Sequence, residues 1–232
     1  MENVKHVFFD LDKTLWDFET NSRAALLEIF ELNKINQKGI DDFDSFYQTY
    51  AIINEQCWDL YRRNLMHKEY LRHQRFYLTL KQFNIDDRRL AKVIGAEYVV
   101  LSPSKTALMD GAVDVLEHLS KRFPLHIITN GFEEVQYQKM RNTGIDKYFK
   151  HVITSEKAGR RKPDPAIFRF ALQRAGTQAQ QSVMIGDDLD IDIKGAAVNG
   201  MRAIWYNPTS KQADVHHSPT ITHLHTLCDL FP

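Results

Sequence analysis

Two aspartates, Asp10 and Asp12, follow the first apolar run of the chain, Val7-Phe8-Phe9. Successive side chains of a strand point to opposite faces, so Asp10 and Asp12 point the same way if the extended backbone continues to Asp12. Two neighbouring carboxylates repel each other, and folding alone gives no reason to pair them. A bound cation, or a reaction that needs one ionised and one protonatable carboxyl group, would explain the pair. Taken alone, the pattern also fits a polar turn or a helix cap.

Three later segments carry further reactive side chains, each at or just beyond the end of an apolar run. Thr129-Asn130-Gly131 offers a hydroxyl and backbone N–H groups that suit phosphate oxygens, although it also fits an ordinary strand-to-helix turn. Lys162, which precedes a proline, can direct its ammonium group at a fixed anion, whereas most lysines only solvate a surface. The segment Gly186–Asp192 holds four carboxylates in six residues, which requires a cation or a helix N-terminus.

The acidic segment does not have the pattern of an EF-hand. Counting from Asp188, the sixth position is Ile193 instead of glycine, and the twelfth is Asn199 instead of glutamate. Mg²⁺ typically takes one or two carboxylates and keeps several waters, so not all four aspartates are ligands. We therefore assign Asp188 and Asp190 to helix capping or to the surface.

Alternating strand and helix patterns predict the scaffold that brings these segments together. Five short, β-branched or aromatic-rich runs predict buried parallel strands: Val4–Phe9, Leu125–Thr129, His151–Thr154, Ser182–Ile185 and Arg202–Tyr206. Helical patterns cover Ala112–Lys121 (with Val113, Leu116 and Leu119 on one face), Glu133–Asn142 and Pro165–Arg174. The alternation predicts an α/β fold with a doubly wound, Rossmann-like parallel sheet. The carboxyl ends of parallel strands share one edge, so we expect the four segments to meet there.

One interval, residues 17–102, has only helical pattern. It includes the apolar positions Ala25, Leu26, Ile29 and Phe30, and two more stretches at about 54–65 and 68–83. We expect an α/β core of residues 1–16 and 103–232, and an inserted all-helical cap over the strand ends.

Composition narrows the classes of partner. The 232 residues contain 30 Lys plus Arg and 30 Asp plus Glu, so the formal net charge of zero gives no support to a nucleic-acid or membrane-surface partner. Two cysteines and no visible secretion signal favour a cytoplasmic protein. The closing segment, with His216, His217, His223, His225 and Cys228, fits no standard zinc spacing, and we assign it to a surface loop and a final helix. The sequence specifies no oligomeric state.

Together the four segments resemble the motifs of the haloacid dehalogenase-like hydrolase superfamily. The motifs are Asp10 to Thr14 (DLDKT), Thr129, Lys162 in RKPDP, and Gly186–Asp192 (GDDLDID). The resemblance covers residues 1–16 and 103–232, and the helical insert is similar in position and size to the family's smaller cap. As a set, the motifs are highly specific.

The resemblance implies a phosphatase mechanism. It implies that Asp10 is the nucleophile that forms an aspartyl-phosphate, and that Asp12 protonates the leaving alkoxide and then activates water. Asp12 also separates phosphatases from the family's dehalogenases, which release halide without protonation and lack this second aspartate.

The resemblance also implies a cofactor and a phosphate site. Mg²⁺ would be held by Asp10, the backbone carbonyl of Asp12 and Asp187, with Asp192 acting through water or from the outer shell. The phosphoryl oxygens would be bound by Thr129, the Asn130 N–H and Lys162.

The substrate is expected to be a small phosphomonoester. The stretches Glu69–Phe76, TNGFEEVQ and RKPDPAIF are similar to those of pyrimidine 5′-nucleotidases, which favours a nucleoside monophosphate. Candidate substrate contacts are Phe18, Trp58, Arg62 and Arg75, although aromatic side chains in a small helical cap also serve its own core. The alternatives are a sugar-phosphate or phosphoglycolate phosphatase, a phosphomutase, and a catalytically silent binding protein on the same fold.

Overall fold

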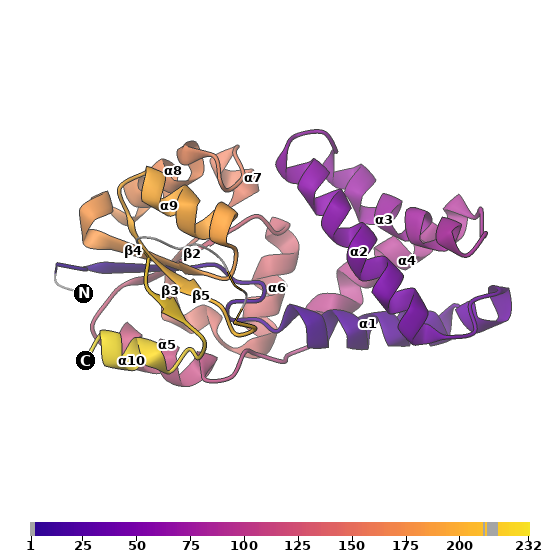
Figure 1. Ribbon diagram of the computed structural model, residues 1–232, viewed down its shortest axis with the longest axis horizontal. Coiled ribbons are helices and arrows are strands. Elements are labelled where there is room, and N and C mark those ends of the chain that lie inside the picture. Colours follow the sequence, from indigo (N-terminus) through magenta and orange to yellow (C-terminus); the bar gives the residue numbers. More distant parts are fainter. Residues whose placement is uncertain (1–2, 211, 213–217) are drawn as a thin grey trace. The chain divides into compact units, whose positions relative to one another are not determined.

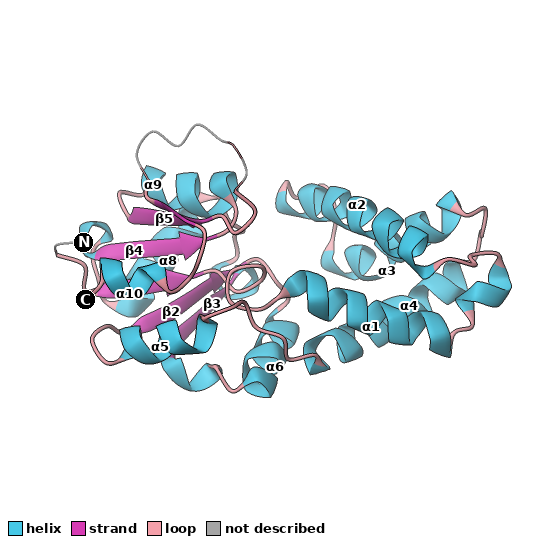
Figure 2. Cartoon of the chain, turned by 60° about the horizontal axis from the view of Figure 1, so that its bottom comes forward, coloured by secondary structure: helices cyan, strands magenta, loops and turns pink. Residues whose placement is uncertain are grey.

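The computed structural model describes residues 3–210, 212 and 218–232. The chain divides into two compact units, one made of residues 1–18 and 106–232 and the other of residues 19–105. The strands all belong to the first unit, and the second is helical (Figure 2). No helix in these described ranges is long and apolar enough to cross a membrane.

The first unit is built on a six-stranded parallel sheet with the strand order β3-β2-β1-β4-β5-β6. Its strands are β1 (His6–Phe9), β2 (Leu125–Thr129), β3 (Phe149–Thr154), β4 (Ser182–Gly186), β5 (Arg202–Tyr206) and β6 (Thr220–Ile221). β1 lies between β2 and β4, and Phe9 is in register with Ile127 on one side and Ile185 on the other. Ligands of open α/β sheets bind where the strand order reverses, which here is at the carboxyl ends of β1, β2 and β4. The predicted fold class is confirmed.

Helices cover both faces of the sheet (Figure 1). One face packs against α5 (Ala112–Ser120), α6 (Glu133–Thr143) and α10 (Thr226–Leu230), in a core that includes Val7, Phe9 and Leu116. The other packs against α8 (Pro165–Ala175) and α9 (Gly195–Val198), in a core that includes Phe8 and Phe168. Alternate residues of β1 thus enter opposite cores, as expected of a strand buried on both sides. A short helix, α7 (Ser155–Ala158), follows β3.

The second unit consists of α1 (Phe18–Leu32, which begins in the first unit), α2 (Phe43–Arg62), α3 (Lys68–Gln82) and α4 (Arg88–Leu101). Asp42 and Asp87 cap α2 and α4 by accepting hydrogen bonds from backbone N–H groups in the first turn of each helix. Helices α3 and α4 approach closely at Gly95, where a Cβ atom would lie 2.6 Å from the Arg72 carbonyl oxygen. The core of this unit is apolar and aromatic, and it includes Phe46 and Phe76.

Several local predictions differ from the structure. β6 lies within the segment that we had assigned to a loop. Helix α2 begins at Phe43, well before the expected start near residue 54. Of the three apolar residues expected on one face of α5, Leu116 and Leu119 are buried with Ala112 and Val115, whereas Val113 is 39% exposed.

Candidate active site

The chain after β1 makes a tight, buried turn that presents Asp10 and Asp12. The backbone N–H groups of Leu15 and Trp16 both donate to the carbonyl oxygen of Leu11, at 2.9 and 2.8 Å. Lys13 takes a positive φ of 65° within this turn. Leu11, Leu15 and Trp16 are buried, which anchors the turn in the core, so the two carboxylates are carried by a fixed backbone.

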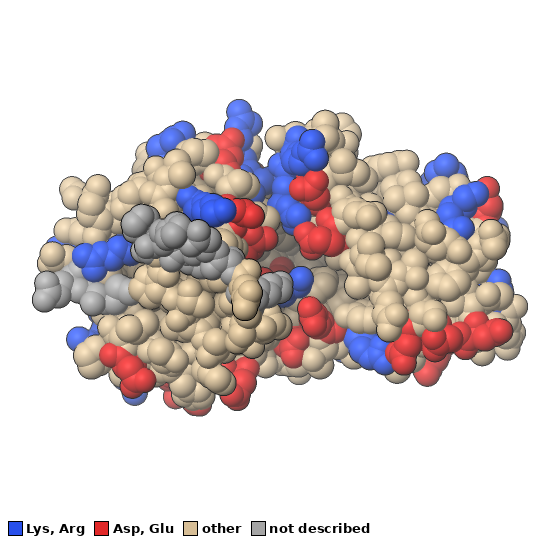
Figure 3. All heavy atoms as spheres, in the orientation of Figure 1, with Lys and Arg blue, Asp and Glu red and all other residues tan. Residues whose placement is uncertain are grey.

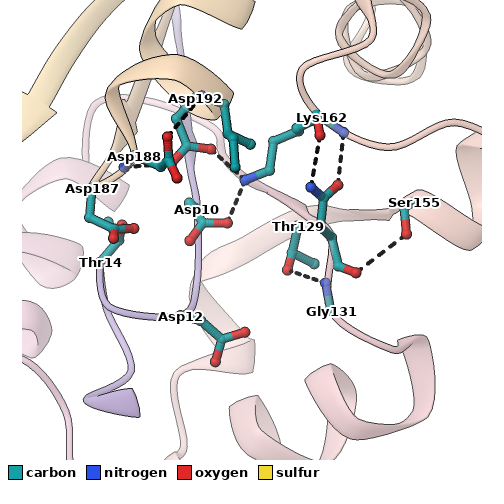
Figure 4. A network of polar contacts seen from close by, with 12 residues as sticks. Asp10, Asp12, Thr14, Thr129, Gly131, Ser155, Lys162, Asp187, Asp188 and Asp192 are labelled. Carbon is teal, nitrogen blue, oxygen red and sulfur yellow. Dashed lines mark hydrogen bonds and ion pairs between the residues drawn. The ribbon is translucent and has the colours of Figure 1, made fainter. Parts of the chain in front are cut away.

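Lys162 connects the nucleophile candidate to the acidic segment. Its Nζ lies 2.5 Å from Asp10 Oδ1 and 2.6 Å from Asp192 Oδ1 (Figure 4). The Asn130 side chain holds the Lys162 backbone, because its Oδ1 accepts from the Lys162 N–H at 2.8 Å and its Nδ2 donates to the Lys162 carbonyl at 2.9 Å. Asn130, which was singled out for its backbone N–H, thus has a side chain that positions the lysine.

The acidic segment contains a helix-capping carboxylate, an exposed one and a buried one. Asp188 accepts hydrogen bonds from the N–H groups of Asp190 and Ile191, both at 3.0 Å, so its predicted capping role is confirmed. Asp190 is exposed and pairs with Lys194 at 2.6 Å. Asp192 is buried and packs so close to Gly186 that a Cβ atom there would collide with its carboxylate.

Three carboxylates converge at this point. Ligand atoms of Asp10, Asp187 and Asp192 all lie within 4.8 Å of one another. The hydroxyl of Thr14 also donates to Asp187 Oδ1 at 3.2 Å. Carboxylate and hydroxyl oxygens are the donors that Mg²⁺ prefers, so the residues present fit a hard divalent cation.

The electrostatics of the cluster also call for a cation. Burial raises the pKa of Asp10 well above its usual value. The Lys162 ammonium opposes this shift, and the charges of the neighbouring carboxylates add to it. Burial likewise raises the pKa of Asp192, and it raises the pKa of Asp187 to about 7. For Lys162, burial acts to lower the pKa, but Asp10 and Asp192 raise it above the ordinary lysine value. One ammonium group therefore faces three carboxylates, and a metal ion would neutralise the remaining charge.

Two further side chains reach this edge from α6, and the sequence motifs did not reveal them. Gln136 Nε2 donates to Asp12 Oδ2 at 2.9 Å and to Thr129 Oγ1 at 2.7 Å. Lys139 Nζ lies 2.5 Å from Asp12 Oδ1. Both residues share a helical face with the buried Met140, so a polar side chain at a core position was the signal that could have identified them.

The comparison with known families is decisive for the class of protein. A family model described as haloacid dehalogenase-like hydrolase matches residues 4–200. The chain belongs to the haloacid dehalogenase-like hydrolase family. The motifs quoted for the resemblance lie within the matched range.

Individual relatives cover almost the whole chain. A protein of Bacillus subtilis named "Putative HAD-hydrolase YfnB" is 30% identical, covering 91% of this chain and 87% of its own. Its magnesium-bound crystal structure superposes with a TM-score of 0.88 and covers 98% of each chain. The pyrimidine 5′-nucleotidase PynA of Streptococcus pneumoniae is 28% identical, covering 93% of this chain and 89% of its own. A glyceraldehyde 3-phosphate phosphatase of Methanothermobacter thermautotrophicus is 30% identical, covering 92% and 90% respectively.

The four candidate substrate contacts have different environments within their own units. Arg75 is buried, donates to Asn54 Oδ1 at 2.8 Å and lies 5.0 Å from the centre of the Phe76 ring, so it belongs to the core of the helical unit. Arg62 pairs with Glu55 at 2.6 Å, and Trp58 packs edge-on against Tyr61. Phe18 packs against Trp16 beside the Asp12 turn.

The histidines of the closing segment form no metal site within the described residues. His225 lies 3.2 Å from Asp114, and His223 lies 3.0 Å from Thr222. His216 and His217 lie outside the described residues. The expected final helix is present as α10.

Proposed function

We propose that this chain is a Mg²⁺-dependent phosphomonoester hydrolase that forms an aspartyl-phosphate on Asp10, and that its preferred substrate is a nucleoside 5′-monophosphate. The observation that carries the proposal is the group of Asp10, Asp187 and Asp192 around the buried ammonium of Lys162. A buried lysine bound to two carboxylates, next to an unneutralised third, is costly for folding and is explained by a site that binds a cation and an anion together.

The residues have distinct roles in this mechanism. The Asp10 carboxylate attacks phosphorus, the bond from phosphorus to the leaving oxygen breaks, and Asp12 donates a proton to that oxygen. A water molecule then attacks the phosphorus of the aspartyl-phosphate and gives a proton to Asp12, which releases inorganic phosphate and restores Asp10. Lys162, Thr129 and the Asn130 N–H bind the phosphoryl oxygens, and Lys162 offsets the charge of the nucleophile.

The proposed metal ligands are Asp10, the backbone carbonyl of Asp12, and Asp187, with Asp192 acting through water. Mg²⁺ bound there would supply the positive charge that lets a phosphate dianion approach a carboxylate. The magnesium-bound structure of YfnB supports this choice of metal.

The substrate preference is supported by the similarity to PynA along nearly the whole chain. The helical unit is proposed to be the cap that selects the substrate, and the interdomain movement described for YfnB is consistent with such a role. The similarity to a glyceraldehyde 3-phosphate phosphatase favours one alternative, a sugar-phosphate phosphatase with the same mechanism.

Phosphate release from a panel of substrates tests the proposal. The panel contains pyrimidine and purine monophosphates, sugar phosphates and phosphoglycolate, each with Mg²⁺ and with a chelator, and Asp10→Asn serves as the inactive control. Chelator-sensitive release that is fastest on pyrimidine monophosphates would support the full proposal. Preference for a sugar phosphate would keep the mechanism and replace the substrate. No release from any of them by the wild type would refute the hydrolase.

A further inference from the structure

Helix α6 places two buried polar side chains against the acid/base candidate. Gln136 is completely buried and Lys139 is only 4% exposed. Residues three apart lie on the same face of a helix, so both side chains point to the same place. A lysine is rarely buried to this extent without a partner whose charge requires it there.

The contacts of these two residues occupy both oxygens of Asp12. Lys139 Nζ is 2.5 Å from Asp12 Oδ1, and Gln136 Nε2 is 2.9 Å from Asp12 Oδ2. The ammonium group also lies 4.0 Å from the centre of the Trp16 ring, which is itself buried in the turn that carries Asp12. The Asp12 carboxylate is therefore fixed from two directions, while its side chain stays 27% exposed.

Gln136 extends this arrangement to the phosphate site. Its Nε2 group donates a second hydrogen bond, at 2.7 Å, to Thr129 Oγ1. The same hydroxyl accepts from the Gly131 N–H at 3.1 Å. One side-chain amide thus connects the residue proposed to handle protons to the hydroxyl proposed to bind the phosphoryl group.

We propose that Lys139 and Gln136 are positioning residues that hold the Asp12 carboxylate in the orientation needed to take a proton from the attacking water. The proposal rests on the hydrolase mechanism above. Each carboxylate oxygen has two lone pairs, and α6 uses one on each oxygen, so each oxygen keeps a lone pair for substrate or water. Misplacing a catalytic group by about 1 Å can cost a factor of about 100 in rate.

The alternative is that Lys139 only stabilises the fold. Buried ion pairs often contribute little net stability compared with well-packed apolar residues, and the Trp16 ring would accept a methionine of similar length. A purely structural lysine would change the free energy of unfolding but not the balance between the two chemical steps. The two explanations therefore differ in which step of the reaction slows.

The test is the steady-state fraction of phosphorylated enzyme during turnover of p-nitrophenyl phosphate with Mg²⁺. The nitrophenolate leaving group needs little protonation, so loss of Asp12 positioning should slow mainly the hydrolysis of the aspartyl-phosphate. We expect Lys139→Met to lower kcat about 10- to 100-fold and to raise the phosphorylated fraction, measured by acid quench and intact-protein mass. Lys139→Arg retains a cation, so its kcat and its phosphorylated fraction should both lie closer to the wild-type values.

Two more variants complete the design. Gln136→Leu should also raise the phosphorylated fraction, and in addition weaken competitive inhibition by inorganic phosphate, because Thr129 loses its partner. If Lys139→Met fails to fold, Gln136→Leu carries the test alone. Arg141→Met removes an exposed cation from the same helix and should behave as the wild type.

The outcomes separate the two proposals. If the phosphorylated fraction of Lys139→Met and Gln136→Leu equals that of the wild type, the positioning role is wrong, whatever happens to kcat. If the wild type neither turns over nor becomes phosphorylated, the proposed hydrolase itself is wrong.

Discussion

His126, on the central part of the sheet, should make the folded protein less stable in mild acid. Its ring is 1% exposed and stacks between His6 on β1 and His151 on β3, with centroid distances of 5.3 Å to each. One ring nitrogen, Nε2, lies 3.0 Å from His6 Nδ1. Burial, followed by the charges of His6, His151 and Lys150, lowers the pKa of His126 to about 3.

The sign and size of the effect follow from this pKa. Between pH 6.5 and 3 the unfolded chain binds a proton at His126 that the folded protein does not, so the free energy of unfolding falls as the pH is lowered. The slope approaches about 1.4 kcal/mol per pH unit, which lowers the free energy of unfolding by about 3 kcal/mol between pH 7.5 and pH 4.5. The protonated ring carries an N–H on both nitrogens, and Nδ1 has no hydrogen-bond partner among the described residues.

Urea unfolding at the two pH values measures this loss in the wild type and in His126→Phe. The raised pKa values of Asp10, Asp187 and Asp192 act with the opposite sign, but they are common to both proteins and cancel in the comparison. We expect the free energy of unfolding of the variant to fall by about 3 kcal/mol less than that of the wild type on acidification. Ile128→Val serves as a control, because Ile128 lies on the same strand as His126 and in the same apolar core as Phe8. Its free energy of unfolding should be about 1 kcal/mol below that of the wild type at both pH values. Equal losses for wild type and His126→Phe would refute the low pKa.

Three predictions concern the site itself. Asp10→Asn should abolish phosphate release and leave the free energy of unfolding unchanged or higher, because it removes a poorly compensated buried charge. An activity assay and a urea titration measure the two effects, and turnover at the wild-type rate would exclude Asp10 as nucleophile. Mg²⁺ at about 100 times its Kd should raise the free energy of unfolding by about 2.7 kcal/mol. Asp187→Asn should reduce that increase. No increase in the wild type would contradict a metal site at Asp10, Asp187 and Asp192. Lys162→Met should lower the free energy of unfolding by about 3–5 kcal/mol, because it leaves Asp10 and Asp192 without their cation, and calorimetry showing a change below about 1 kcal/mol would contradict this.

The sheet and the four motif segments could be predicted from the sequence for a physical reason. Strands buried on both faces are short, continuous apolar runs. At or just beyond the ends of β1, β2 and β4 stand polar residues that folding alone does not explain. Once the strands are taken as parallel, their carboxyl ends share an edge, and Asp10, Lys162 and Asp192 meet there in the structure. Their chemical roles remain proposals.

Other features depend on contacts that no local pattern encodes. β6 is only two residues long, and its pairing with Trp205 and Tyr206 comes from the fold rather than from any apolar run. Val113 is apolar like the core residues of α5, yet it is 39% exposed, and the valine that the helix buries is Val115. Gln136 and Lys139 are polar residues of a predicted helix, and only the folded chain brings them to Asp12.

The chain leaves and re-enters the α/β unit at neighbouring points. The Asp17 N–H donates to the carbonyl of Ala107 at 3.1 Å, and the Met109 N–H donates to the carbonyl of Leu15 at 2.9 Å. A flexible loop as long as residues 19–105 would cost about 4 kcal/mol in closure entropy by the logarithmic dependence on length. A segment that folds by itself with its two ends together removes most of that cost.

The helical unit therefore costs the sheet about as little closure entropy as a short loop between Asp17 and Ala107 would. Insertions of this kind are tolerated because the host fold meets only two adjacent ends. Evolution could exchange, enlarge or shorten the helical unit as one module while the turn that carries Asp10 stays intact. The paired segments at Asp17 and Ala107 are therefore the natural junctions for exchanging the helical unit in chimeric proteins.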